Sequence, residues 1–536
     1  MHLPTPQETA QTDTGAMSAG ERRGLLALSL GVALVVVDMS VINLVIPRMA
    51  ADLHLGFTGV QYVSALFTLA AAAVVLGAGD LADRIGARTA YLGGLGVFLL
   101  GSLVVTVAPT EAVILGGRIV QGIGGGVAMT AALGLINNNW KGAARGTAFA
   151  LYGATFAAAS AAGPLLGAGL AEVGGWRLAF AINLVLGPVA FYGVRTLVRE
   201  APARTDVRRP DIGGLLLASA SITALAFGLI QGPSYGWLHA TADADLLGVS
   251  FHRGAISPTL AVLVLAAALA AGFVTLERSR SRRGHPVIAD PALTRVRSFT
   301  IGNLALLIVG VGEFGLLFLL PLDLQVGRGL SALHAGLVVL PVSIGAVVSF
   351  PLVDKLAAHG GARAAVLAGI ALEAAGLLGV AAAVQSTHIV WLLPAFFVYG
   401  LGIGGATAQL TNLVLAEVPD GRNSLAGGIS SAVRNLGSTL GVALLGLAFT
   451  AGVAHAGIPG LAESPAQTVT ALTAAGHTAS ITQAGAALAN GITLAGLLAV
   501  AFLAVGLLAV RRMPTTPTTA AAVPSAQQAE PSPARR

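Results

Sequence analysis

Long apolar runs alternate with short polar segments along almost the whole chain. Each run holds about 20 residues, the length that a helix needs to cross a hydrocarbon core about 30 Å thick. We count fourteen runs, at about 24–47, 58–78, 89–107, 111–136, 146–171, 178–197, 211–231, 256–276, 299–320, 333–352, 364–384, 389–413, 424–450 and 489–510. They lack the two-residue alternation of barrel strands, so each is predicted to be a membrane-spanning helix.

Two basic stretches, near 199–210 and 277–298, divide the runs into groups of six, two and six. The sequence therefore predicts an all-α integral membrane protein with two six-helix halves and two extra central helices. The expected parts are a disordered cytoplasmic tail at 1–20, a six-helix bundle at 21–200, a linker with two helices at 201–298, a second six-helix bundle at 299–512 with an outer loop at 451–488, and a disordered tail at 513–536.

A glycine-rich repeat relates the two groups of six. The segment 121–126, QGIGGG, in one run is echoed by 399–405, YGLGIGG, in the other group. In this alignment Phe396 occupies the position that matches Arg118. Two six-helix halves related by a parallel repeat are the layout of one large class of transporters.

Composition and charge support a membrane protein. Charged residues make up only 10% of the chain, against about 25% in soluble proteins. If the N-terminus is cytoplasmic, the opposite loops hold only Arg48, Arg177, Arg253 and Arg328. This bias predicts that both termini are inside, and it assigns the net charge of +6 to topology and inner-leaflet lipid instead of nucleic acid. The chain has no cysteine, which excludes disulfides and thiolate metal sites.

A tight charged turn, GDLADRIGAR at 79–88, separates two of the apolar runs. It matches the signature of a loop between the second and third helices of the major facilitator superfamily. Three more segments resemble motifs of the same superfamily. They are residues 38–43 followed by Pro47, residues 118–122, and Gly163-Pro164-Leu165-Leu166-Gly167. The pair Trp176-Arg177 with Asn183 also fits. The ordered set resembles the fourteen-helix drug:proton antiporters of that superfamily, although Ala168 replaces the second terminal glycine of the helix 5 motif.

This resemblance implies proton-coupled efflux of hydrophobic or cationic drugs and antibiotics by alternating access. It implies a multi-pass protein of the bacterial cytoplasmic membrane, with small-molecule substrate, protons and lipid as its partners. We expect a monomer that binds no nucleic acid, is not an enzyme, and uses the proton gradient in place of a cofactor or metal.

Charged residues within the membrane need partners or water, and they are functional candidates. Asp38 lies about 14 Å from the outer end of its helix and Arg118 about 10 Å, so the two are at similar depth. We expect them to form a charge pair that couples a proton to transport. The alternative is a static salt bridge that only fixes helix packing.

Three more charges lie within the runs of the second half. Glu313 is predicted to be a second proton site or an anchor for a cation, with an interhelical hydrogen bond as its alternative. For Arg434 two roles are open, holding Glu313 or shaping an inner gate. Glu373 lies on a helix that is peripheral in the resembled family, so a packing contact is favoured over chemistry there.

Proton handling is assigned mainly to the first half, because the second half offers aromatic and apolar surface at the matching position. The candidates for the substrate cavity are Asn43, Gln121, Phe314, Phe318, Phe396, Tyr399, Gln409 and Arg434. Simple packing is the alternative reading of the aromatic residues.

Two segments are predicted to serve conformational change. In the charged turn, the gate residues are Gly79, Asp83, Arg84, Gly86 and Arg88, and Asp83 would latch the halves together on the cytoplasmic side. A plain topology turn is the alternative. In the helix 5 motif, Gly163, Pro164 and Gly167 would form a bend that acts as a pivot or is a static kink.

Other functions remain open at this point. An exporter of one endogenous metabolite or biosynthetic product is the nearest rival. An intramembrane enzyme is disfavoured, because the chain has no H-E-x-x-H or G-x-S-x-G motif and no cysteine nucleophile. A P-loop for ATP is also absent from the sequence, and a non-transporting sensor is disfavoured by the embedded charges.

Overall fold

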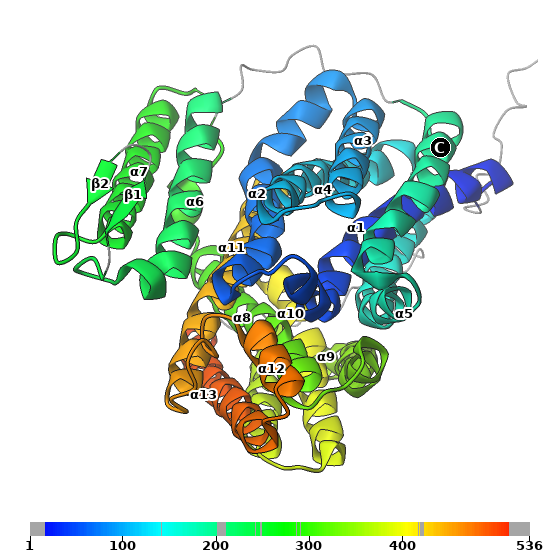
Figure 1. The fold of residues 1–536 in the computed structure, drawn as a ribbon. Helices are drawn as coiled ribbons and strands as arrows, with labels where there is room; N and C mark the ends of the chain where they lie inside the picture. The colour runs from blue at the N-terminus through cyan, green and yellow to red at the C-terminus, as the bar shows by residue number, and fades with distance from the viewer. Residues whose placement is uncertain are drawn as a thin grey trace, which may run out of the picture.

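The computed structural model describes residues 17–140, 142–200, 211–241, 243–246, 249–285, 287–289, 291–415, 417–418 and 423–513. Three groups of helices are visible in Figure 1. The N-terminal half is coloured blue to cyan, the C-terminal half green to red, and a separate pair, α6 and α7, stands beside them. Of the tails predicted at 1–20 and 513–536, residues 1–16 and 514–536 lie outside the described residues.

The N-terminal half holds α1 (Ala19–Asp52), α2 (Phe57–Ile85), α3 (Ala87–Thr106), α4 (Glu111–Asn139) and α5 (Gly142–Leu197). The C-terminal half holds α8 (Arg297–Pro321), α9 (Ala332–Ala383), α10 (Leu392–Leu415), α11 (Asn423–Ala454), α12 (Pro465–Ala474) and α13 (Thr478–Arg511). A π-helical turn, Leu322–Gly327, extends α8, and short 3-10 turns cover Pro291–Arg295 and Ile389–Trp391.

Two of these long helices are pairs of helices joined across a break. Backbone angles leave the helical region at Gly174 and Gly175 in α5, and at Gly361 in α9. Within the described residues, thirteen helices are long and apolar enough to cross a membrane, with the two parts of α9 already separate. The segment Ala162–Leu197 among them contains the break at Gly174 and Gly175. Counting both segments of α5 gives the fourteen spans that the sequence predicts.

The structure moves several predicted boundaries. The first helix starts within the predicted tail, because Ser18 and Glu21 form a capping box in which each side chain accepts from the other's backbone N–H. The outer loop is shorter than 451–488, since α11 continues to Ala454 and α13 begins at Thr478. A small antiparallel hairpin of β1 (Ala244–Leu246) and β2 (Val249–Phe251) is an addition to the all-α prediction.

The extra pair consists of α6 (Ile212–Tyr235) and α7 (Pro258–Arg282). Helix α6 packs against α2 and α11, one helix from each half, while α7 packs mainly on α6. At one end of the pair, Arg280 Nε lies 3.2 Å from Asp211 Oδ2. Much of α7 is exposed and apolar, as expected of a helix that faces lipid.

The internal repeat is visible in how the glycines pack. Gly122 of α4 faces α2, and its counterpart Gly400 of α10 faces the first segment of α9. Gly124 faces α3, and its counterpart Gly402 faces the second segment of α9. Small residues allow such close helix contacts within a membrane. The glycine-rich repeat therefore builds the same helix packing twice.

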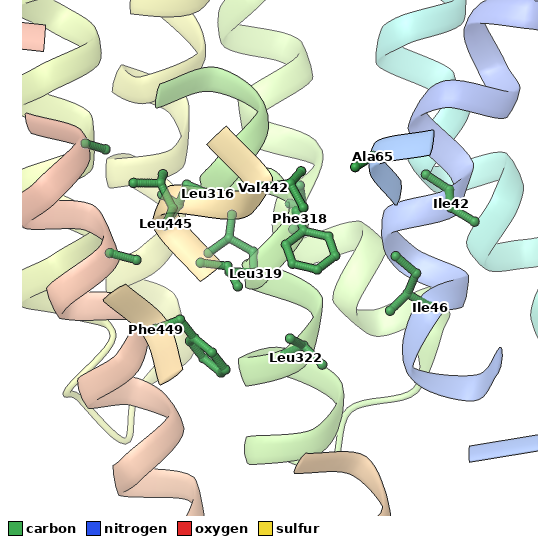
Figure 2. Packing of buried hydrophobic residues seen from close by; sticks show 14 of the residues in the cluster. Ile42, Ile46, Ala65, Leu316, Phe318, Leu319, Leu322, Val442, Leu445 and Phe449 are labelled. Carbon is green, nitrogen blue, oxygen red and sulfur yellow. The ribbon is translucent and has the colours of Figure 1, made fainter. Parts of the chain in front are cut away.

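The two halves meet at the end of the bundle that is remote from residues 19 and 511. The Phe57 ring of α2 lies 6.1 Å from the Phe318 ring of α8 and 5.3 Å from the Phe449 ring of α11. Figure 2 shows the apolar side chains of α8 and α11 gathered here, with Phe318 projecting toward the N-terminal helices. Polar links cross the same seam, since Gln61 donates to the Val442 carbonyl at 3.0 Å and the Thr68 and Thr439 hydroxyls lie 3.1 Å apart.

The opposite end of the bundle is looser. A Cβ atom added at Gly79 of α2, or at Gly427 or Gly428 of α11, would meet no other atom within 4 Å. These glycines lie on the two helices whose far ends form the closed seam. The halves are thus joined at one end, and open space lies beside these three glycines at the end that carries the charged turn.

Candidate functional site

A buried ion pair joins α1 to α4. Arg118 Nη1 donates to Asp38 Oδ2 at 2.6 Å, and the two residues are only 1% and 2% exposed. The second oxygen, Asp38 Oδ1, accepts from Gln121 at 2.9 Å and from Asn183 of α5 at 3.0 Å. Ser102 of α3 accepts from the same two amides at 2.9 and 3.2 Å. Every helix of the half except α2 thus contributes a side chain to this network.

The Arg118 guanidinium is also anchored to α2. Its Nε donates to the Val63 carbonyl at 3.0 Å, and its Nη1 donates to Gln121 Oε1 at 2.8 Å. The guanidinium carbon lies 4.7 Å from the centre of the Phe67 ring, within cation–π range. A buried charge is stable only with such partners. The predicted contact between Asp38 and Arg118 is therefore made, and further hydrogen bonds from both side chains support it.

A second ion pair lies in the C-terminal half. Arg434 Nη2 of α11 lies 3.1 Å from both carboxylate oxygens of Glu313 in α8. The Tyr399 hydroxyl of α10 donates to the carbonyls of Gly312 and Glu313, which holds the backbone beneath this carboxylate. The Arg434 guanidinium also lies 5.9 Å from the Phe314 ring. The structure thus brings Glu313 and Arg434 together, as the sequence suggested.

A small cavity lies between the halves. Its wall includes Asn43, Thr68 and Arg118 from the N-terminal half, with Phe314 and Ser438 from the C-terminal half. The ion pair of the N-terminal half therefore borders the cavity through its arginine. Polar and aromatic groups from both halves face the same space.

The other residues predicted for a substrate cavity lie elsewhere in this conformation. Phe318, Phe396 and Tyr399 are fully buried in helix packing. Gln121 belongs to the Asp38 network, and Gln409 is half-buried on α10. Asn43 and Phe314 are the predicted residues on the cavity wall, while Arg434 approaches it beside Phe314.

The charged turn at 79–88 is held by an acid that sequence reasoning did not select. Gly86 ends α2 and begins α3 with φ of +91°, a conformation that favours glycine. The Glu200 carboxylate accepts from the backbone N–H groups of Arg88 and Thr89, both at 2.9 Å, and so caps α3. Arg88 Nη1 in turn donates to the carbonyl of Val198. Asp83 is exposed at the end of the bundle opposite the seam.

The motif at 163–167 packs α5 against α1. A Cβ atom on Gly163 would collide with Ser40, and one on Gly167 would collide with Val41. Ala168, which departs from the family pattern, lies beside Gly336 of α9. The non-helical angles of α5 fall at Gly174 and Gly175, between the predicted spans 146–171 and 178–197, and the bend at Gly163 and Pro164 stays a prediction.

Ser102 and Glu200 carried no recognisable signal in the sequence. Ser102 is one of many small polar residues in apolar runs, and its role depends on the rotation of α3. Glu200 follows the last span of its half among basic residues, where it resembles a solvated charge. The sequence singled out Asn183 only as part of a family motif, and it gave no sign of the hydrogen bond to Asp38.

The fold and the buried pairs define a multi-pass membrane transporter built from two related six-helix halves. The sequence matches the Major Facilitator Superfamily over residues 28–442, and the chain belongs to this family. It is thus a transporter and not an enzyme.

One relative is the multidrug resistance protein Stp of Mycobacterium tuberculosis (strain CDC 1551 / Oshkosh), with 31% identity over 79% of this chain and 74% of that protein. A second is the tetracenomycin C resistance and export protein of Streptomyces glaucescens, with 27% identity over 82% of this chain and 78% of that protein. Among solved structures, a bacterial homologue of the human lysosomal transporter Spinster, in an inward-facing and unoccupied conformation, aligns with a TM-score of 0.63. That alignment covers 93% of this chain and 98% of the other at 16% identity, so it supports the fold alone.

Proposed function

We propose that this protein exports hydrophobic or cationic drugs, antibiotics among them, in exchange for protons. The observation that carries the proposal is the buried Asp38–Arg118 pair on the wall of the central cavity. The name of the mycobacterial relative, a multidrug resistance protein, supports drugs as the substrate class. The energy source would be the proton gradient.

The network suggests how a proton is coupled. A proton bound to Asp38 would cancel its charge and weaken its hydrogen bond from Arg118. Arg118, still held by Val63 and Gln121, would then present its charge to the cavity and repel a cationic substrate. Loss of the proton would restore the pair and again favour a cation. Proton and substrate would therefore occupy the site alternately, as antiport requires.

The conformation supports alternating access. We assign the end opposite the seam, which carries residues 19 and 511, to the cytoplasm, because the lysines and arginines gather there. We propose that the cavity opens toward this end when the transporter faces inward. Closure of this end would bring α2 toward α11, and exposed Asp83 would accept hydrogen bonds from the C-terminal half as a latch.

The test is ethidium efflux from cells and from proteoliposomes with an imposed proton gradient. Asp38→Asn removes the titrating group and keeps the shape of the side chain, so gradient-driven efflux should fall to the level of empty vesicles. The matched control is Asp52→Asn, at the exposed end of the same helix, where Asp52 pairs with Arg177. Wild-type efflux that is independent of the proton gradient, or full activity of Asp38→Asn, would refute the coupling.

A second candidate is the export of one specific metabolite or biosynthetic product. The Streptomyces glaucescens relative favours it, since that protein is named for the export of a single compound. The polar wall groups Asn43, Thr68 and Ser438 could recognise such a compound. A panel of unrelated drugs and dyes separates the two, because a specific exporter would leave resistance to all of them unchanged.

A further inference from the structure

Glu373 is a buried acid that the Asp38 site does not use. It lies on the second segment of α9 and is 0% exposed. Within the described residues, neither of its carboxylate oxygens has a hydrogen-bond partner. An ionised carboxylate in such a position is expensive, because burial removes its hydration without replacing it.

The groups around Glu373 come from four helices. A Cβ atom on Gly312 of α8 would lie 3.1 Å from Glu373 Oε1, beside the Leu503 side chain of α13. On α10, Gly402 packs on the Glu373 backbone, and Tyr399 points its hydroxyl at the carbonyls of Gly312 and Glu313. The charged groups in electrostatic reach are Glu313 of α8 and Arg434 of α11.

The cluster of Glu373, Glu313 and Arg434 differs from the Asp38–Arg118 pair in its balance of charges. Asp38 and Arg118 neutralise each other. The second cluster has two acids, Glu313 and Glu373, for one arginine, and Arg434 is already bidentate on Glu313. Neutrality in an apolar setting therefore requires one bound proton, and the acid without a partner is the group to carry it.

The internal repeat shows that the fold does not require an acid here. Gly124 packs on the Phe98 backbone of α3, as Gly402 packs on the Glu373 backbone of α9. Phe98 thus fills the position in the N-terminal half that Glu373 fills in the C-terminal half. An apolar side chain satisfies the packing in one half, so the acid in the other serves a different purpose.

We propose that Glu373, Glu313 and Arg434 form a second proton-binding site, with the proton on Glu373 in this conformation. The proposal deepens the proton coupling proposed above and rests on it. When Arg434 shifts from Glu313 to Glu373, the proton passes from Glu373 to Glu313, and the total charge of the three side chains stays zero. Glu313, next to the cavity residue Phe314, would then exchange that proton with water in the cavity.

The experiment is infrared spectroscopy of the purified transporter in lipid nanodiscs near neutral pH. A protonated carboxyl gives a carbonyl stretching band that is distinct from ionised carboxylates and amides. We expect this band in the wild type and a marked loss of its intensity in Glu373→Gln. Arg434→Gln should enlarge it, because both acids then need a proton. The control Glu417→Gln removes an exposed acid of the same half and should leave the band unchanged.

A band that persists unchanged in Glu373→Gln, or is absent from the wild type, overturns the proposal. Ethidium efflux by the same preparations separates this failure from failure of the antiport itself. A normal infrared result without gradient-driven efflux would refute the coupling while leaving Glu373 as a proton carrier. Gradient-driven efflux with no Glu373 band would preserve antiport and remove Glu373 from it. Glu373→Asp, which keeps the acid, should keep the band.

Discussion

The two halves share one helix packing and differ in how they balance buried charge. In the N-terminal half, one acid, Asp38, pairs with one arginine, Arg118, and both carboxylate oxygens of Asp38 accept hydrogen bonds. In the C-terminal half, Glu313 and Glu373 compete for Arg434, and Glu373 has no hydrogen bond among the described residues. The first cluster is stable as it stands, while the second is complete only with a proton. This refines the sequence-based assignment of proton handling mainly to the first half.

The largest effect is expected from Arg118→Ala. It leaves the Asp38 carboxylate buried without its arginine, and breaking one side of a buried pair costs about 3–5 kcal/mol. Thermal unfolding in detergent should show a strongly lowered midpoint. Arg177→Ala, which removes an exposed pair with Asp52, should shift the midpoint far less. Equal shifts for the two variants would show that the buried network is not what stabilises this half.

An effect of opposite sign is expected from Glu373→Leu. The change removes a buried acid without hydrogen bonds and supplies apolar volume, so the protein should be stabilised by about 1–3 kcal/mol. The same unfolding assay measures it. Efflux should fall at the same time, if the second site carries a proton. A destabilised Glu373→Leu protein would mean that the carboxyl has a structural partner, and the contrast between the halves would disappear.

The smallest effect is expected from Ser102→Ala. Ser102 accepts hydrogen bonds from Gln121 and Asn183, but both amides keep Asp38 as a partner. The loss should be about 1 kcal/mol. Unfolding measurements check the size, and the proton-gradient assay should show that transport survives. Complete loss of transport in Ser102→Ala would show that the orientation of the two amides is part of the coupling chemistry.

Sequence reasoning predicted the spans well because the membrane imposes their length and composition. The depth of Asp38 and Arg118 along their helices was enough to predict their contact. The rotation of each helix was harder to predict, because lipid and helix neighbours are both apolar and leave little periodic pattern. Phe318, Phe396 and Tyr399 were thus predicted to face a cavity, and the structure buries them between helices.

The roles of Glu200 and Glu373 could not be predicted from the sequence for other reasons. Glu200 caps α3 from a distant part of the chain, and its partners are backbone N–H groups that every sequence contains. Glu373 lies on a helix judged peripheral by resemblance to the family. Only the packing of Gly312 and Gly402 around it reveals how thoroughly it is enclosed.

The seam at the closed end also bears on the speed of transport. Aromatic contacts of Phe57 and the polar links Gln61–Val442 and Thr68–Thr439 hold it. A hydrogen bond contributes about 1 kcal/mol net, so each link adds little to the barrier against parting. The seam can therefore open and close repeatedly. The time that it stays closed would depend on single groups such as the Thr439 hydroxyl. Turnover could thus change in evolution without any change to the charges that bind protons.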